Sequence, residues 1–357
     1  MDVVAEFNIT YDSCLDQNGQ LSAEPPTVAS DKTLCEKLYQ YMQLSRTLDT
    51  KVVNLQRTGK MGTYAAATGQ EAVAASIGAA MQADDVLVSV YRENAALLQR
   101  GVTIQEILAY WGGDERGNDW SSREDWPFCV PLSTQMLHAS GIAKAFQYRK
   151  QARVVVAVIG DGASSKGDFY EAINVAGAWK LPLVVVVNNN QWAISVPRHK
   201  QTSAETLAQK GIAAGLPSRQ VDGNDALMMY DALHHAIENA RNGGGPALIE
   251  AMTYRLCDHT TADDATRYRE KTDTDTAWEA EPIKRFNKFL TQQHGWSEMQ
   301  EETLKTKCAA NVDQAVQDYL KQDKQAPGTM FDFLFAQLPD SLQAQRDEVI
   351  KLAGGSN

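Results

Sequence analysis

The chain has 357 residues, of which 43% are hydrophobic, enough for a globular protein of one or two domains with a substantial core. Its formal net charge of −11 argues against nucleic acid as the main partner. Five cysteines without a CxxC pair argue against a disulfide framework or a zinc site, and they favour a reducing compartment.

Residues 1–30 combine polar and turn residues and end in Pro25-Pro26, so we expect an extended N-terminal arm. The arm has neither the apolar core of a signal peptide nor an Arg-rich transit pattern. No apolar run in the chain is long enough to span a bilayer. We therefore expect a cytoplasmic protein without a membrane partner.

A long helix is predicted after the arm, because Ser30 or Asp31 can cap a segment whose apolar residues recur at helical spacing from Leu34 to Leu55. A glycine-punctuated loop then leads into a helix of small residues, Ala72 to Ala80, which favours close packing in the core. Within that loop we interpret Thr63 and Tyr64 as the wall of a pocket.

The apolar segment from Val86 to Val88 is a predicted strand, and Tyr91 and Arg92 fall just after it. Arginine suits bidentate contact with phosphate. Taken alone, however, this pattern is explained better by a surface arginine that caps a helix or pairs with Glu93.

Another helix is predicted from Gln135 to Phe146, after Pro131 interrupts the chain. Ser133 or Thr134 can cap it. His138 lies on this helix, and we interpret it as a packing or surface residue rather than a ligand.

The clearest pattern in the chain runs from Arg153 to Ser195. Two apolar runs, Val154 to Ile159 and Leu183 to Val187, flank a glycine-rich turn and a helical segment from about Asp168 to Trp179. Strand, turn, helix and strand form a βαβ unit, and wholly apolar strands are typical of a parallel sheet covered on both faces. The sequence therefore predicts an α/β fold.

Polar residues follow both of these strands. Asp161 lies in the turn Gly160-Asp161-Gly162, and Asn188-Asn189-Asn190 follows the second strand. Ligands of open α/β sheets bind beyond the carboxyl ends of the strands. Carboxylate, amide and carbonyl oxygens suit Mg²⁺, which also takes phosphate oxygens, and the two glycines allow the backbone to approach a phosphate. The alternative is an ordinary βα turn followed by a polar loop.

A further buried strand is predicted from Pro246 to Arg255, and it leads to a long polar loop that carries His259. Taken alone, His259 is equally well a loop histidine with a local hydrogen bond. The adjacent His234 and His235 share one helix at a spacing that does not place them on one face, so we do not expect them to bind a metal.

The C-terminal part of the chain carries apolar residues at helical spacing. We predict that they share one helical face that packs in the core or against another subunit: Phe331, Leu334, Phe335 and Leu338.

The central segment resembles the thiamine-diphosphate motif, in which GDG is followed by 26 residues and then NN. Further segments, YRE, PLSTQ, VDGND and EAMTYR…DHTTADDATRYR, follow in the order of one family. This family is the alpha subunit of the thiamine-diphosphate-dependent decarboxylating component of 2-oxo acid dehydrogenase complexes. The resemblance covers roughly Leu34 to Leu338. It implies a thiamine-diphosphate-binding domain over residues 31–340, with a mostly parallel sheet and helices on both faces, between an arm (1–30) and a tail (341–357).

The resemblance also implies roles for individual residues. Asp161, Asn190 and the carbonyl of Trp192 would bind Mg²⁺, and His259 would act on intermediates beside the thiazolium and help to meet the lipoyl arm. Thr134 and Gln135 match a structural site for a monovalent cation in some relatives. The remaining expected cofactor contacts are Tyr91 and Arg92 at the diphosphate, Val130 and Leu132 under the aminopyrimidine, and Gly160, Gly162 and Ala163 in the turn.

The expected partners are a beta subunit, in an α₂β₂ heterotetramer, and the lipoyl acyltransferase component. The beta subunit would supply the glutamate at the aminopyrimidine, so we expect none in this chain. Pyruvate is our first expectation for the substrate, and a branched-chain 2-oxo acid such as 3-methyl-2-oxobutanoate, or acetoin, remains open. Two other classes of protein make different demands on the sequence. An inactive subunit would have lost Asp161, Asn190 or Arg92, and a single-chain thiamine enzyme would need a second thiamine domain.

Two departures from the family pattern bear on these expectations. Asn188 stands where relatives often carry Glu or Arg, so one diphosphate contact would differ. Thr260 and Thr266 match serines that are phosphorylated in mitochondrial relatives, and we interpret them as structural.

Overall fold

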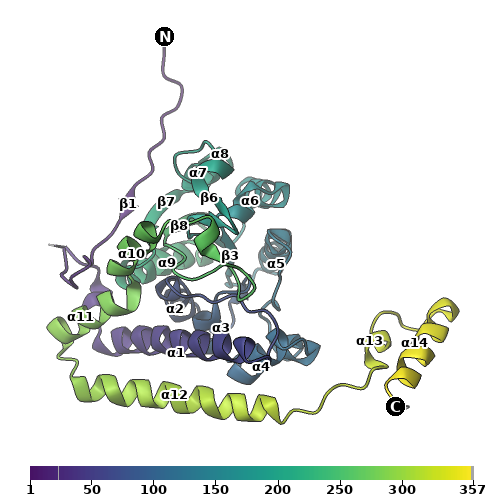
Figure 1. Cartoon of the computed structure of the whole chain (residues 1–357). Coiled ribbons are helices and arrows are strands. Elements are labelled where there is room, and N and C mark those ends of the chain that lie inside the picture. The colour runs from purple at the N-terminus through teal and green to yellow at the C-terminus, as the bar shows by residue number, and fades with distance from the viewer. Residues whose placement is uncertain (23, 355–357) are drawn as a thin grey trace.

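A sheet of six parallel strands forms the centre of the computed structural model, which describes residues 1–22 and 24–354 (Figure 1). The strands lie in the order β1-β7-β8-β4-β3-β2. They are β1 (Tyr11–Asp12), β2 (Val86–Val88), β3 (Val155–Gly160), β4 (Leu183–Asn189), β7 (Ser218–Asp222) and β8 (Ala247–Met252). A separate antiparallel hairpin joins β5 (Trp192–Ala193) to β6 (Val196–Pro197). The predicted α/β fold with a parallel sheet is confirmed.

Helices connect the strands and continue beyond the sheet. The α-helices are α1 (Lys32–Arg57), α2 (Glu71–Ala80), α3 (Asn94–Gln99), α4 (Ile104–Trp111), α5 (Thr134–Arg149), α6 (Gly167–Trp179), α7 (Arg198–Gln201), α8 (Ala208–Ala213), α9 (Ala226–Arg241), α10 (Lys271–Glu279), α11 (Pro282–His294), α12 (Glu298–Leu320), α13 (Thr329–Asp332) and α14 (Asp340–Leu352). Short 3₁₀ helices are η1 (Thr27–Ser30), η2 (Glu115–Asn118), η3 (Gly162–Ser165) and η4 (Ala265–Arg267).

Alternate side chains of the central strands enter two separate hydrophobic cores. Val156 and Val184 belong to the core under α1, α2 and α9, whereas Val155 and Val185 belong to the core under α5 and α6. Successive side chains of a strand point to opposite faces of a sheet, so a strand that is apolar throughout supplies both cores. Every residue of β4 is buried, which is why its sequence is apolar from Leu183 to Val187.

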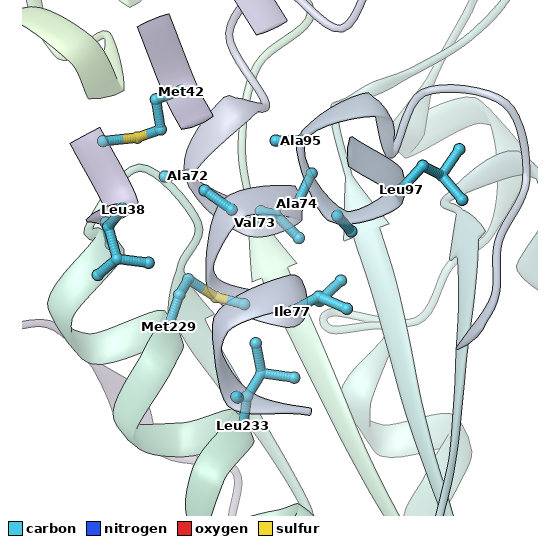
Figure 2. Close-up of a cluster of buried hydrophobic side chains, with 14 of the residues drawn as sticks. Leu38, Met42, Ala72, Val73, Ala74, Ile77, Ala95, Leu97, Met229 and Leu233 are labelled. Atoms are coloured by element: carbon cyan, nitrogen blue, oxygen red, sulfur yellow. The ribbon is translucent and has the colours of Figure 1, made fainter. Parts of the chain in front are cut away.

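The helix of small residues packs as its composition predicts. In Figure 2, Val73 and Ile77 of α2 lie near side chains of α1, α3 and α9, including Met42 and Met229. Alanines on α2 allow these helices to approach closely. The long first helix is also confirmed, and its cap is Asp31, whose side chain accepts a hydrogen bond from the Leu34 N–H at 3.0 Å.

Part of the N-terminal arm belongs to the sheet of this chain. Tyr11 and Asp12 form β1 at the sheet edge beside β7, and Cys14 and Leu15 are buried. The N–H groups of Cys14 and Leu15 each donate to the carboxylate of Asp225 at 2.7 Å. Polar composition gave no sign that the second half of the expected arm would be anchored to the sheet.

The predicted apolar helical face near the C-terminus is wrong. Helix α13 ends at Asp332, so Leu334, Phe335 and Leu338 lie outside it. Phe331 is buried, but Leu334 and Phe335 are 62% and 52% exposed. A helix of this length gains stability mainly from packing, and Figure 1 shows α13 and α14 lying away from the body of the protein.

Helix α14 occupies most of the region predicted as a tail, whose residues 355–357 lie outside the described part of the chain. Within the described residues, no helix is both long enough and apolar enough to cross a membrane.

Candidate active site

A cavity of about 390 Å³ opens where β2, β3 and β4 end, and the loop after β8 reaches it. The parallel sheet explains this meeting, because the carboxyl ends of neighbouring parallel strands share one edge. Of the site residues predicted from the sequence, the cavity brings together Thr63, Tyr91, Arg92, Val130, Leu132, Gly160, Asp161, Gly162, Ala163, Asn190, Trp192 and His259.

Asp161 is a buried carboxylate at the floor of this cavity. It is only 3% exposed, and burial raises its pKa to about 6. Its Oδ2 accepts a hydrogen bond from the amide of Gln201 at 3.2 Å, which lowers the pKa and only partly opposes the effect of burial. A buried carboxylate of this kind is stabilised by a cation, since its charged form is costly without one.

The two glycines beside Asp161 meet different requirements. A Cβ atom on Gly162 would lie 2.6 Å from the Cβ of Ala193, so only glycine allows the β5–β6 hairpin to pack against the turn. A Cβ atom on Gly160 would meet nothing within 4 Å. The chain next forms η3, and α6 begins at Gly167, close to the predicted start of this helix at about Asp168.

The three asparagines after β4 point to different partners. The Asn190 amide donates to Oε1 of Gln70 at 3.1 Å, and its Oδ1 accepts from the Trp192 N–H at 3.2 Å. The Asn189 amide donates to Glu250 at 2.7 Å, and Asn188 accepts from Thr253. Only Asn188 and Asn190 line the cavity, while Asn189 anchors the loop to β8.

The loop that follows takes an unusual backbone path. Gln191 has φ 72° and Ile194 has φ 57°, in the left-handed region that residues other than glycine rarely occupy. These turns carry Trp192 and Ile194 to the cavity wall. No glycine marks them, so the sequence contains no signal for this conformation.

His259 lies against two guanidinium groups. Its Nδ1 is 3.1 Å from Nη2 of Arg92 and 3.4 Å from Nη1 of Arg255, and Arg92 also donates to the His259 carbonyl at 2.8 Å. Burial, Arg92 and Arg255 lower its pKa to about 4, so the imidazole is neutral at pH 7. An arginine can only donate, so Nδ1 is the acceptor and Nε2 carries the proton.

Arg255 is fully buried and joins the two sides of the cavity. Its guanidinium donates to the carbonyl of Ile194 at 2.9 Å and to the hydroxyl of Tyr268 at 2.7 Å, and it lies 3.5 Å from the carbonyl of Trp192. Asp263 accepts from the His259 N–H at 2.8 Å and from the hydroxyl of Tyr268. The loop after β4 and the loop after β8 are therefore held in one network.

Tyr64 does not line the cavity, although its neighbour Thr63 does. The Tyr64 ring is fully buried, and its hydroxyl donates to Asp49 at 2.6 Å and accepts from Asn94 at 2.8 Å. The aromatic wall is instead formed by Tyr91 and Trp111, which meet edge to face with ring centroids 6.3 Å apart.

The rim of the cavity on the side of α5 is exposed and apolar. Val130 and Leu132 are 48% and 43% exposed. The next residue, Ser133, has φ 69° and makes no capping hydrogen bond, so neither proposed cap holds this helix. The side-chain oxygens of Ser133 and Gln135 are buried and have no hydrogen-bond partner among the described residues. Cation binding at Thr134 and Gln135 stays a prediction.

Residues 39–328 match the family described as "Dehydrogenase E1 component". The chain belongs to this family. It is 41% identical over 317 residues to the "3-methyl-2-oxobutanoate dehydrogenase subunit alpha" of Mycobacterium tuberculosis, covering 87% of this chain and 85% of the relative. It is 38% identical over 346 residues to the "Pyruvate dehydrogenase E1 component subunit alpha" of Acholeplasma laidlawii, covering 95% and 99%. The protein of the same name from Staphylococcus aureus is 38% identical over 343 residues, covering 94% of this chain and 91% of the relative.

This E1 chain is thus the alpha subunit of a 2-oxo acid dehydrogenase of the pyruvate or branched-chain type, and an oxidoreductase that depends on thiamine diphosphate. The cavity fits such a cofactor. Asp161 forms no ion pair among the described residues, and the amide nitrogen of Gln70 is buried at the cavity wall without an acceptor. The open space at Gly160 admits a ligand close to the backbone.

Sequence reasoning missed several residues of the E1 cavity. Gln70, Trp111 and Ile194 line it, and Gln201 and Arg255 hold residues that do. Gln70 lies in the segment ATGQEA, and Arg255 ends the segment EAMTYR, which was matched to the family without a role for this arginine. Gln201 lies in a polar stretch that carries no pattern of its own.

Proposed function

We propose that this chain is the alpha subunit of a pyruvate dehydrogenase component, which decarboxylates pyruvate oxidatively and transfers the acyl group to a lipoyl group of an acyltransferase component. One observation supports this most strongly. Four separate loops, after β2, β3, β4 and β8, bring Arg92, Asp161, Asn190 and His259 to a single cavity. No structural requirement of the sheet explains all four residue types together.

In this proposal Asp161, Asn190 and the carbonyl of Trp192 hold Mg²⁺, which also binds the diphosphate of the cofactor. The bound cofactor supplies a carbanion for attack on the 2-oxo carbon and an electron sink for decarboxylation. Gly160 admits the diphosphate close to the backbone of the turn. Neutral His259 would donate a hydrogen bond from Nε2 to a substrate oxygen, while Arg92 and Arg255 fix its ring through Nδ1.

The aromatic wall favours a small substrate. Trp111 meets the rings of Tyr64, Tyr91 and Tyr110 at centroid distances of 5.3, 6.3 and 5.4 Å, so the indole is held from three sides. A wall fixed in this way narrows the space beside the cofactor. The branched-chain substrate 3-methyl-2-oxobutanoate is the second candidate, supported by the 41% identity to the mycobacterial relative.

An alpha subunit implies a beta subunit in the same complex. We further propose the α₂β₂ stoichiometry and the lipoyl acyltransferase as the acceptor. The exposed apolar rim of Val130 and Leu132 supports a partner that covers this side of the cavity. The exposed side chains of Phe333, Leu334 and Phe335 support a second partner surface, outside the cavity.

The test uses the complex co-expressed with its beta subunit and supplied with an artificial electron acceptor. We expect kcat/KM to be at least about tenfold higher for pyruvate than for 3-methyl-2-oxobutanoate or acetoin, since pocket contacts with a small alkyl group are worth roughly 10–200-fold. A preference for 3-methyl-2-oxobutanoate would contradict the proposed substrate and would leave the family assignment unchanged.

A variant tests the role of the wall. Trp111→Leu should reduce the preference for pyruvate, whereas Trp179→Leu, on the exposed surface of α6, should not change it. An unchanged preference for pyruvate in Trp111→Leu would show that the aromatic wall does not determine substrate specificity.

A further inference from the structure

Lys210 is a buried lysine without an ion-pair partner. It lies on α8, is 6% exposed, and forms no ion pair with a carboxylate among the described residues. The ring of Tyr170 lies 5.4 Å from its ammonium nitrogen. Burying an unpaired charge costs several kcal/mol, so a lysine in this position needs an explanation.

The ammonium of Lys210 contacts the turn that carries the metal-binding carboxylate. Its Nζ donates to the carbonyl of Ser164 at 2.9 Å and lies 3.0 Å from the hydroxyl of the same residue. The Ser164 hydroxyl in turn donates to the carbonyl of Asp161 at 2.7 Å. One side chain from α8 is therefore bonded to η3 at Ser164, and neither of these two residues lines the cavity.

The charges around Lys210 are close enough to act on it. Burial is the largest effect and lowers its pKa, as does Arg198, while Glu250 and Asp161 raise it. Glu250 forms its hydrogen bonds with other groups. It accepts them from the Asn189 amide at 2.7 Å, from the Ala208 N–H at 2.8 Å and from the Gln220 amide at 3.1 Å.

We propose that Lys210 is a positioning residue for the diphosphate end of the cofactor: its ammonium fixes turn η3 and supplies a positive charge that the bound diphosphate balances. The inference rests on the proposed binding of thiamine diphosphate and Mg²⁺ at Asp161. It explains why a cation is buried against a turn whose residues Gly162 and Ala163 line the cavity. A lysine that only attached α8 to the turn would need no charge.

The test measures ligand binding to the co-expressed complex of alpha and beta subunits at saturating Mg²⁺. We expect Lys210→Met to weaken thiamine diphosphate binding by about 10- to 100-fold, the range for loss of one hydrogen bond to a charged group. Thiamine monophosphate carries less charge than thiamine diphosphate, so its affinity should be weakened clearly less by the same substitution. The apparent Tm of the cofactor-free complex should stay within about 2 °C of wild type, since removal of an unpaired buried charge offsets the lost contacts.

Two further variants keep the proposal testable. Lys210→Arg keeps the charge and should bind thiamine diphosphate within about fivefold of wild type. Ser164→Ala removes one contact of the ammonium, and its effect on affinity should not add to that of Lys210→Met, because both act through one contact. The control is Lys144→Met, a lysine whose nitrogen lies 4.9 Å from the ring of Trp179 outside the cavity, and it should bind normally.

Three results would overturn the inference. The first is unchanged affinity for thiamine diphosphate in Lys210→Met. The second is an equal loss for both thiamine phosphates together with a lowered Tm, which identifies a purely structural contact. The third applies if Lys210→Met fails to assemble: unchanged affinity for thiamine diphosphate in Ser164→Ala, together with loss of that affinity in Lys210→Arg, decides against the inference. Wild-type complex that binds no thiamine diphosphate would refute the proposed function itself, before any variant is considered.

Discussion

Replacing Asp161 by asparagine should stabilise the cofactor-free protein while removing its ability to bind the cofactor. The carboxylate is 3% exposed, and burial raises its pKa from 3.8 to about 6. The folded state therefore binds the proton more tightly than the unfolded state, and stability is lost as the pH rises from about 4 to about 6. Above pH 6 the loss is complete and amounts to about 3 kcal/mol.

Asparagine has the same shape and no charge, so Asp161→Asn avoids this loss. For a chain of 357 residues, about 3 kcal/mol corresponds to a rise in Tm of roughly 4 °C. The assay is thermal unfolding of the EDTA-treated, cofactor-free complex at pH 7.5 and at pH 5, and the gain should be smaller at pH 5. Calorimetry at saturating Mg²⁺ should show no binding of thiamine diphosphate, because the anionic metal ligand is gone.

Asp114→Asn is the matched control. Hydrogen bonds from Arg116 lower the pKa of Asp114 to about 2, so its charge stabilises the fold and its removal should give no gain in Tm. A lowered Tm in Asp161→Asn would refute the buried-charge reasoning, and binding of thiamine diphosphate and Mg²⁺ as in the wild type would refute the metal assignment.

Three other predictions concern the site. His259→Ala should keep near-normal cofactor affinity and lose about 10²–10⁴-fold in overall activity. Acyl transfer to the lipoyl group should be reduced more than turnover with an artificial electron acceptor. Equal losses in the two assays, together with weakened cofactor binding, would identify His259 as a structural residue. Gly162→Ala should weaken cofactor binding at least about tenfold, because its Cβ would lie 2.6 Å from that of Ala193, whereas Gly167→Ala meets nothing within 4 Å and should bind normally in the same titration. The alpha subunit purified alone should not turn over any 2-oxo acid, and a rate equal to that of the complex would contradict the need for a beta subunit.

The elements nearest the motifs could be predicted because each has a local pattern. Apolar runs identified β3 and β4, and the polar residues directly after them identified Asp161 and Asn190. Tyr64 shows the limit of such reasoning. The neighbouring sequence does not indicate whether its ring faces the cavity or the core. Its hydrogen-bond partner Asp49 lies in the preceding helix, and the two side chains meet only in the folded protein.

Effects of charged residues that lie far apart in the chain could not be predicted from the sequence either. The sequence left open whether His259 is charged near neutral pH. The answer depends first on burial of the ring and then on Arg92, which comes from a loop 167 residues earlier in the chain. The predicted helix around Phe335 failed for a related reason. Periodicity identifies a helical face only where another element covers it, and α13 lies apart from the core (Figure 1).

The exposed segment around α13 has a consequence for how this protein is made. Phe333 is 87% exposed and Met330 is 57% exposed, beside Leu334 and Phe335. Contiguous apolar side chains in water promote self-association. A partner that covers this surface would remove these side chains from water, and an alpha chain without that partner would be more prone to aggregation or chaperone binding. Contact with that partner would therefore protect the alpha chain before it takes part in any catalysis.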